Sequence, residues 1–151
     1  MEAAISAVRE IGGLPFWPFT LARLGYAYAR KGQRQKSLAT LNTAIEEGDR
    51  TGSQMAQAEM LRLKGEVLVM QEGTATAAAE RCFRAAIAVA RAQEAKWWEL
   101  RATVSLARVL RDTNRREEAR TILADIYNWF TEGFDTADLK DAKALLDELS
   151  N

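Results

Sequence analysis

The chain has 151 residues, which is long enough for one domain with a substantial buried core. Basic and acidic residues each total 21, so net charge gives no reason to expect nucleic acid or an anionic membrane as the main partner. The sequence has no histidine, and its one cysteine, Cys82, cannot form an internal disulfide. Because no stretch has the roughly 18 apolar residues of a membrane span, and no signal peptide is visible, we expect a cytoplasmic protein.

Helical periodicity runs through almost the whole chain, and alternating strand patterns are not visible. A short helix is expected over residues 2–11, ended by Gly12 and Gly13. The helices that follow are predicted over residues 16–31, 33–50, 53–71, 76–94, 97–112, 115–130 and 136–149. Ser53 and Thr136 are expected to be N-caps. Because the connections are short, neighbouring helices should be antiparallel.

A repeat of about forty residues relates these helices to one another. Gly25 and Gly65 lie inside predicted helices, where glycine costs about 1 kcal/mol relative to alanine, and Ala107 continues the series. We therefore predict that a second helix approaches closely at each of these positions. The second helix of each pair carries a small residue and then a large one: Ser37 and Leu41, Ala79 and Phe83, Ala119 and Leu123.

The repeated residues resemble the tetratricopeptide (TPR) pattern, in which a first helix reads Leu-Gly-x-x-Tyr and a second reads Ala-x-x-x-Phe-x-x-Ala. Residues 24–28, Leu-Gly-Tyr-Ala-Tyr, are a close match, although the period exceeds the usual length of about 34. The resemblance implies an all-α, right-handed superhelical solenoid of antiparallel helix hairpins. The expected units are a half-repeat over residues 2–13, repeats over 16–52, 53–94 and 96–131, and a capping helix over 136–150.

Some segments match a particular family of sequences more closely than the TPR spacing alone requires, among them residues 58–66, 98–102 and 129–136. They resemble the C-terminal TPR region of bacterial multidomain signalling proteins. In that family a class III adenylate/guanylate cyclase domain, or a DNA-binding domain, precedes an AAA-like ATPase domain and then the repeats. The resemblance implies a regulatory or protein-binding segment whose partners include the neighbouring domains of a longer protein.

No residue pattern predicts an active site, a metal site or a cofactor site. A phosphate-binding loop needs glycine immediately before lysine, and Gln35 stands before Lys36. Cys82 lies beside Phe83, with no histidine in the chain to activate it, so a packing role is favoured over a nucleophilic one. We therefore expect no catalytic residue and no cofactor.

The first helix of each TPR pair lines the concave face, which commonly holds a peptide or a helix. The candidate binding residues on that face are Tyr26, Arg30, Glu59, Arg62, Glu66, Arg101, Arg108 and Arg111. The expected partner is a protein or peptide, and an acidic segment would suit the three arginines of the third repeat through bidentate contacts. The alternative is that these arginines form a solvated helix face and pair with nearby acids such as Glu66, Glu94, Glu99 or Asp112, as surface charges usually do.

Charge is polarised along the chain although it sums to zero. Residues 81–120 hold ten basic residues against five acids, while residues 132–151 hold six acids against two bases.

Two further alternatives for the function and assembly of the chain stay open. The concave surface could bind a small molecule and control an attached ATPase or cyclase, and an uncovered apolar face on residues 2–11 would favour a homodimer through the N-terminal end.

Overall fold

The computed structural model of the chain describes residues 3, 6–7, 16–52, 54, 56–73 and 76–151. These residues form helices and turns without a strand, so the predicted all-α class is confirmed. The helices are α2 (Trp17–Arg30), α3 (Arg34–Thr51), α4 (Gln57–Glu72), α5 (Ala77–Ala92), α6 (Lys96–Asp112), α7 (Arg116–Tyr127) and α8 (Ala137–Ser150). Most of the half-repeat predicted over residues 2–13, the dimer surface expected on it, and Ser53 lie outside the described residues.

The helix starts show how local hydrogen bonds differ at positions that look alike in the sequence. At the start of α5, the Thr76 hydroxyl accepts a hydrogen bond from the Ala79 amide at 3.2 Å, which is an ordinary N-cap. Thr136 occupies the N-cap position of α8 with an extended backbone, as predicted. Its hydroxyl instead donates to the Gly133 carbonyl at 2.7 Å, so the expected side-chain cap is wrong.

Two predicted helix boundaries also need correction. Helix α4 begins at Gln57 with Ala56 in the N-cap position, three residues later than the N-cap predicted at Ser53. Helix α7 ends at Tyr127 because the next residues tighten into a turn, in which the Phe130 amide donates to the Tyr127 carbonyl at 3.2 Å. The ring of Phe130 then packs edge-on against Trp97, with the centroids 5.4 Å apart.

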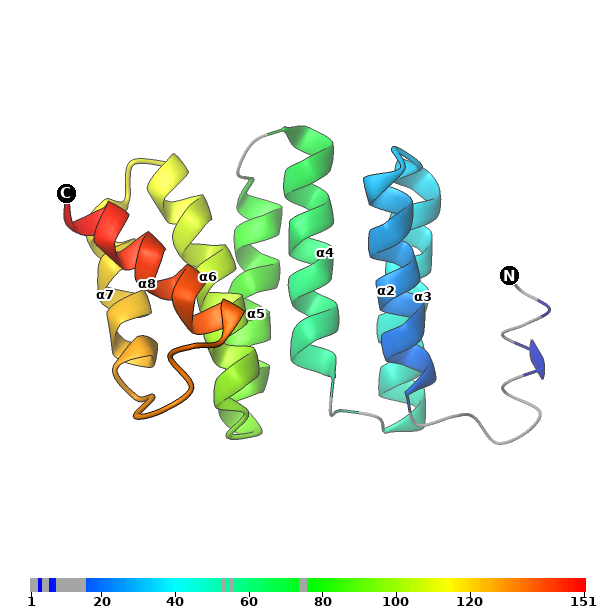
Figure 1. Ribbon diagram of the computed structural model, residues 1–151. Coiled ribbons are helices and arrows are strands. Elements are labelled where there is room, and N and C mark those ends of the chain that lie inside the picture. Colours follow the sequence, from blue (N-terminus) through cyan, green and yellow to red (C-terminus); the bar gives the residue numbers. More distant parts are fainter. Residues whose placement is uncertain (1–2, 4–5, 8–15, 53, 55, 74–75) are drawn as a thin grey trace.

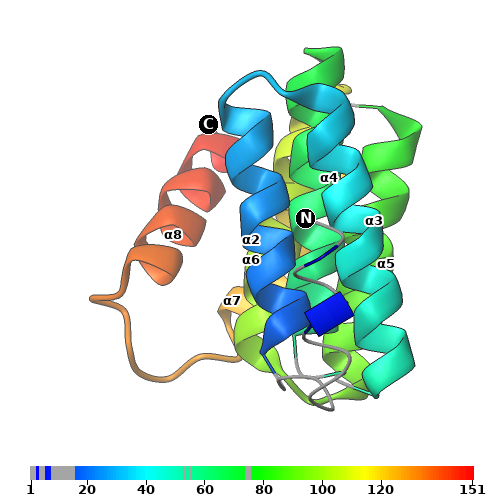
Figure 2. The same ribbon diagram turned by 90° about the vertical axis from the view of Figure 1, so that its right-hand side faces the viewer.

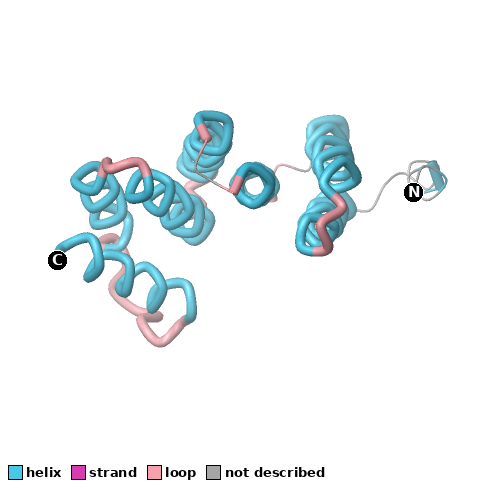
Figure 3. The backbone as a smooth tube through the Cα atoms, turned by 90° about the horizontal axis from the view of Figure 1, so that it is seen from above, coloured by secondary structure: helices cyan, strands magenta, loops and turns pink. Residues whose placement is uncertain are grey.

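The helices form antiparallel hairpins that stand side by side (Figure 1). The pairs are α2 with α3, α4 with α5, and α6 with α7. Helix α4 contacts both helices of the preceding hairpin, α6 contacts both α4 and α5, and α8 closes the series against α6 and α7. From above, the row of helices curves, and α8 turns across its end (Figure 3). Figure 2 shows α8 on the side of the row away from α3 and α5.

The apolar core is divided in two, and α4 contributes to both parts. Met60, Leu63 and Val67 of α4 pack in one cluster with residues of α2 and α3. Leu61 and Leu68 lie against the larger cluster, which is formed by α5, α6, α7 and α8. Helix α4 is therefore apolar on two faces, as expected for a helix held between two layers. None of the helices in the described part of the chain is long and apolar enough to cross a membrane.

Gly25 of α2 and Gly65 of α4 lie where neighbouring helices approach closely, as predicted. A Cβ atom on Gly25 would lie 2.8 Å from the Leu41 Cγ and 3.1 Å from the Ser37 carbonyl oxygen. A Cβ atom on Gly65 would lie 2.5 Å from the Phe83 Cε1. The distances to the Leu41 and Phe83 carbons are shorter than carbon–carbon contact allows. A larger residue at Gly25 or Gly65 must therefore displace Leu41 or Phe83. The spacing of about forty residues thus marks two equivalent helix contacts.

Candidate functional site

A groove of about 530 Å³ opens across α2, α4 and α6, the first helices of the three hairpins. Its walls are formed by Phe19, Arg23, Tyr26, Ala27, Arg30, Lys31, Glu59, Arg62, Leu63 and Arg101. This volume lies in the range of about 300 to 1,000 Å³ that is typical of ligand pockets. Five of the residues are basic and one is acidic, so the lining itself carries an excess of positive charge.

The wall from α2 is aromatic. Phe19 and Tyr26 lie seven residues apart, which places them on one stripe of the helix two turns apart. Phe19 meets the ring of Trp98 edge-on, with centroids 6.4 Å apart, and the Arg101 guanidinium lies 5.5 Å from the centroid of the same tryptophan. Aromatic rings beside cations form a surface that binds both apolar and anionic groups.

The floor of the groove is an ion-pair cluster between α4 and α6. The Glu59 side chain is 4% exposed and accepts two hydrogen bonds from Arg62, at 2.7 and 2.8 Å. Arg101 approaches the same carboxylate at 3.0 Å. Arg62 also donates to Glu66 at 3.1 Å, and the Ser105 hydroxyl donates to Glu66 at 2.6 Å. These contacts satisfy the buried carboxylate of Glu59 from two helices at once.

The pKa of Arg62 reflects this arrangement. Burial of the guanidinium would lower its pKa, and the hydrogen bond and negative charge of Glu59, together with the charge of Glu66, outweigh burial and raise it. Arg62 therefore stays positively charged, and it is committed to these two acids. On the groove floor, the Glu59 carboxylate is held between Arg62 and Arg101.

The remaining arginines of α6 pair with acids on α8. Arg108 donates two hydrogen bonds to Asp141, at 2.6 and 2.7 Å. Arg111 donates to both carboxylate oxygens of Glu148 at 3.1 Å and lies 2.8 Å from Asp112. Arg101 lies 3.7 Å from a carboxylate oxygen of Asp138. The basic and acidic stretches of the sequence therefore neutralise each other where α8 crosses α6.

This pairing matches the alternative in which the arginines meet nearby acids, although most of the acids differ from those expected. Asp112 is a partner of Arg111, and Glu66 is a partner of Arg62. Glu99 is instead held by Arg91 and Lys96, at 2.7 and 2.8 Å. Glu59 of α4 is the nearer partner of Arg101. Helix α8, which the sequence predicted only as a capping helix, supplies Asp138, Asp141 and Glu148.

At the α2 end of the groove the cations have no such partners. Arg23, Arg30 and Lys31 are all exposed and make no ion pair within the described residues. Arg23 lies over the ring of Phe19, 5.8 Å from its centroid. Positive charge on the groove is therefore compensated at α6 and uncompensated at α2.

The structure brings most of the predicted residues together. Five of them line the groove: Tyr26, Arg30, Glu59, Arg62 and Arg101. Arg108 borders an adjoining hollow of about 80 Å³ that also touches Arg62 and Arg101. Glu66 lies behind Arg62 and binds it, while Arg111 lies outside both hollows, beside α8. Sequence reasoning missed Arg23 and Lys31, although Arg23 is seven residues before Arg30 and so lies on the same helix face.

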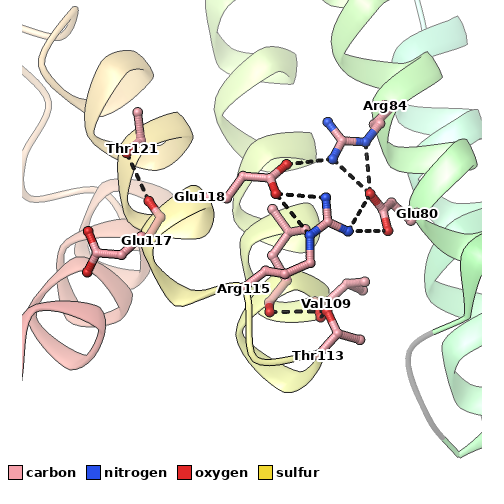
Figure 4. Close-up of polar contacts among 9 residues, drawn as sticks. Glu80, Arg84, Val109, Thr113, Arg115, Glu117, Glu118 and Thr121 are labelled. Carbon is pink, nitrogen blue, oxygen red and sulfur yellow. Dashed lines mark hydrogen bonds and ion pairs between the residues drawn. The ribbon is translucent and has the colours of Figure 1, made fainter.

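A second polar cluster lies away from the groove and joins α5 to α7 (Figure 4). Arg84 donates to Glu80 and Glu118 at 2.8 Å, and Arg115 donates to the same two acids at 3.0 and 2.9 Å. For Glu118, the hydrogen bond from Arg84 is the main cause that lowers its pKa below the usual value near 4.5. For Glu80, partial burial would raise the pKa, and the hydrogen bonds from the two arginines outweigh it and lower it. Both carboxylates are thus held ionised.

We expect this cluster to give the protein a measurable sensitivity to acid. Because the folded-state pKa values of Glu80 and Glu118 lie below 4.5, their contribution to stability is complete above that pH and is lost as pH falls through the lowered values. Urea denaturation measured from about pH 6 to pH 3 should show a shallower decline for Glu80→Gln plus Glu118→Gln than for the wild type. Glu132→Gln, on an exposed turn, is the control, and identical slopes for the wild type and the double variant would refute the expectation.

The described residues hold no group of three or more Cys, Asp or Glu side chains that could bind a metal ion. Cys82 is half-buried, and burial raises the pKa of its thiol despite the nearby charges of Lys64 and Arg81. Such a thiol is a poor nucleophile.

Comparison of the sequence with family models, curated proteins and solved structures gives no match.

Proposed function

We propose that this chain is a non-catalytic protein-interaction module that holds a peptide segment in the groove of α2, α4 and α6. The observation that carries the proposal is the groove itself. It joins an aromatic wall to exposed cations that lack partners among the described residues. Exposed aromatic and arginine side chains are the residues most enriched at the centres of protein interfaces.

We further propose that the hairpins form a solenoid of the TPR type, and that the chain is a regulatory segment of a bacterial cyclase/ATPase signalling protein. The first part is supported by the equivalent contacts at Gly25 and Gly65 and by the curved row of hairpins. The second part is supported by the sequence segments alone. In both cases the module would act by holding a partner or a neighbouring domain, without bond chemistry.

Peptide selection tests the proposal directly. Phage-displayed random peptides would be selected on the wild-type protein, and the selected peptides measured by fluorescence anisotropy. We expect Phe19→Ala to weaken binding about tenfold, because the loss of one anchoring ring costs on the order of 1 to 2 kcal/mol. The matched control is Phe134→Ala, which removes a 44% exposed phenylalanine at the far end of the chain and should leave binding unchanged. Equal affinities for both variants, or no selected peptide, would refute a peptide-binding groove.

The groove volume also favours a second function, which is sensing of a small anionic ligand. A thermal-shift screen with a panel of anionic metabolites separates the two, because a ligand that binds the folded state raises the melting temperature. A metabolite that raises it in the wild type and not in Phe19→Ala, without any selected peptide, would favour sensing.

A further inference from the structure

Helix α8 shows how this fold satisfies arginines that project from the first helices of its hairpins. Its acids Asp138, Asp141 and Glu148 lie three and seven residues apart, on one helical stripe. They meet Arg101, Arg108 and Arg111 of α6 in the same order along the chain. The adjoining stripe of α8 is buried in the core and consists of Leu139, Ala142, Leu145 and Leu149. An acidic amphipathic helix is therefore what covers the arginines of α6.

No described helix covers the arginines of α2 in this way. Helix α8 packs only on α6 and α7 and does not reach α2 or α4. Arg23 and Arg30 are separated by seven residues, the same spacing as Arg101 and Arg108, which corresponds to about 10.5 Å along a helix. Lys31 extends the positive charge at the C-terminal end of α2. The arginines on the α2 side of the groove thus have the same spacing as the α6 arginines that α8 binds. Among the described residues, no acidic side chain binds them.

The groove also restricts where a ligand can carry its charge. The arginines between α4 and α6 are already paired with Glu59, so the positive charge available to an acidic group lies at the α2 edge. The surface between that edge and the floor is formed by Phe19, Tyr26 and Leu63 and favours apolar side chains. A ligand with one acidic face and one apolar face fits both requirements.

We propose that the occupant of the groove is an acidic amphipathic helix of a partner protein, seated on α2 and α4 with its acids on Arg23, Arg30 and Lys31. This inference rests on the proposed function, because it names the chemistry of the peptide that the groove holds. Binding of such a helix differs from binding by charge alone, because the order of acidic and apolar residues in the partner helix decides the affinity.

Three fluorescein-labelled synthetic peptides test the inference by anisotropy. The first copies residues 136–151 with both lysines replaced by glutamate, which keeps the apolar stripe of α8 and adds acids. The second has the same composition in scrambled order, and the third keeps the apolar stripe and carries lysine at every acidic position. We expect the first peptide to bind at least tenfold more tightly than the other two, with an affinity that falls as salt concentration rises.

Variants of the protein locate the site. The triple change Arg23→Gln, Arg30→Gln and Lys31→Gln should weaken binding of the first peptide at least tenfold. The control, Arg81→Gln plus Lys140→Gln, neutralises two exposed cations, one on α5 and one on α8, and should alter binding less than twofold. Circular dichroism establishes that both variants remain helical.

The outcomes separate this inference from the proposed function. If phage-selected peptides bind and depend on Phe19 while the acidic helix does not bind, the inference is overturned and the proposed function stands. Equal binding of the ordered and scrambled peptides overturns the helical part, because charge alone would then suffice. Equal losses for the triple variant and its control overturn the assignment to α2.

Discussion

Replacing Phe83 with alanine is expected to lower the free energy of unfolding by about 3 to 5 kcal/mol. Phe83 is 1% exposed and is among the largest fully buried side chains described. It lies against Gly65 of the neighbouring helix, where the absence of a side chain leaves room for its ring. Truncation removes the ring and leaves a cavity that two rigid helices cannot close. Urea denaturation at neutral pH measures the loss.

A double-mutant cycle with Gly65→Ala makes this prediction specific to the helix contact. In the wild type, Gly65→Ala should destabilise, because its Cβ would lie 2.5 Å from the Phe83 ring. In the Phe83→Ala background the same change should stabilise by about 1 kcal/mol, since only the helix propensity of alanine remains. An equal change in stability in both backgrounds would show that the ring and the glycine are not coupled.

The second large effect is expected at Glu59. Glu59→Gln keeps the shape of the side chain and removes the charge that Arg62 and Arg101 share. Breaking a fully buried pair costs about 3 to 5 kcal/mol, and because Glu66 still binds Arg62 we expect about 2 to 3 kcal/mol here. Glu117→Gln is the control, because that side chain is 81% exposed, and it should change stability by less than about 0.5 kcal/mol.

The same substitution should act in the opposite direction on binding. Without Glu59 the groove gains one positive charge, so the acidic peptide described above should bind several-fold more tightly to the folded variant. Urea denaturation and anisotropy on one preparation measure both effects. A variant that loses stability without gaining affinity for the acidic peptide would place the bound acids away from Glu59.

The helices and their close contacts could be predicted because they follow from local periodicity. Gly25 and Gly65 cost stability in an isolated helix, so their presence signalled a neighbouring helix at each. The cap at Thr136 could not be predicted correctly, because a threonine hydroxyl can accept from one backbone group or donate to another. Only the turn geometry at Gly133 decides between these bonds.

The electrostatics of the groove were only partly predictable. The stripe of Arg101, Arg108 and Arg111 is visible from its spacing within one helix. Its partners on α8 are more than thirty residues away, and their register depends on how α8 crosses α6. For the same reason, the sequence could not show which cations remain uncompensated.

The double role of α4 has a consequence for cooperativity. The α2–α3 hairpin is tied to the rest of the chain mainly through contacts with this one helix. Because α5 to α8 have a core of their own, we expect the α2–α3 hairpin to open as a unit at a lower free energy than the rest of the chain. A ligand bound to both α2 and α4 would then hold the α2–α3 hairpin against the rest of the chain. Ligand binding would reduce local unfolding of the hairpin, and α4 would carry this effect to α5 to α8.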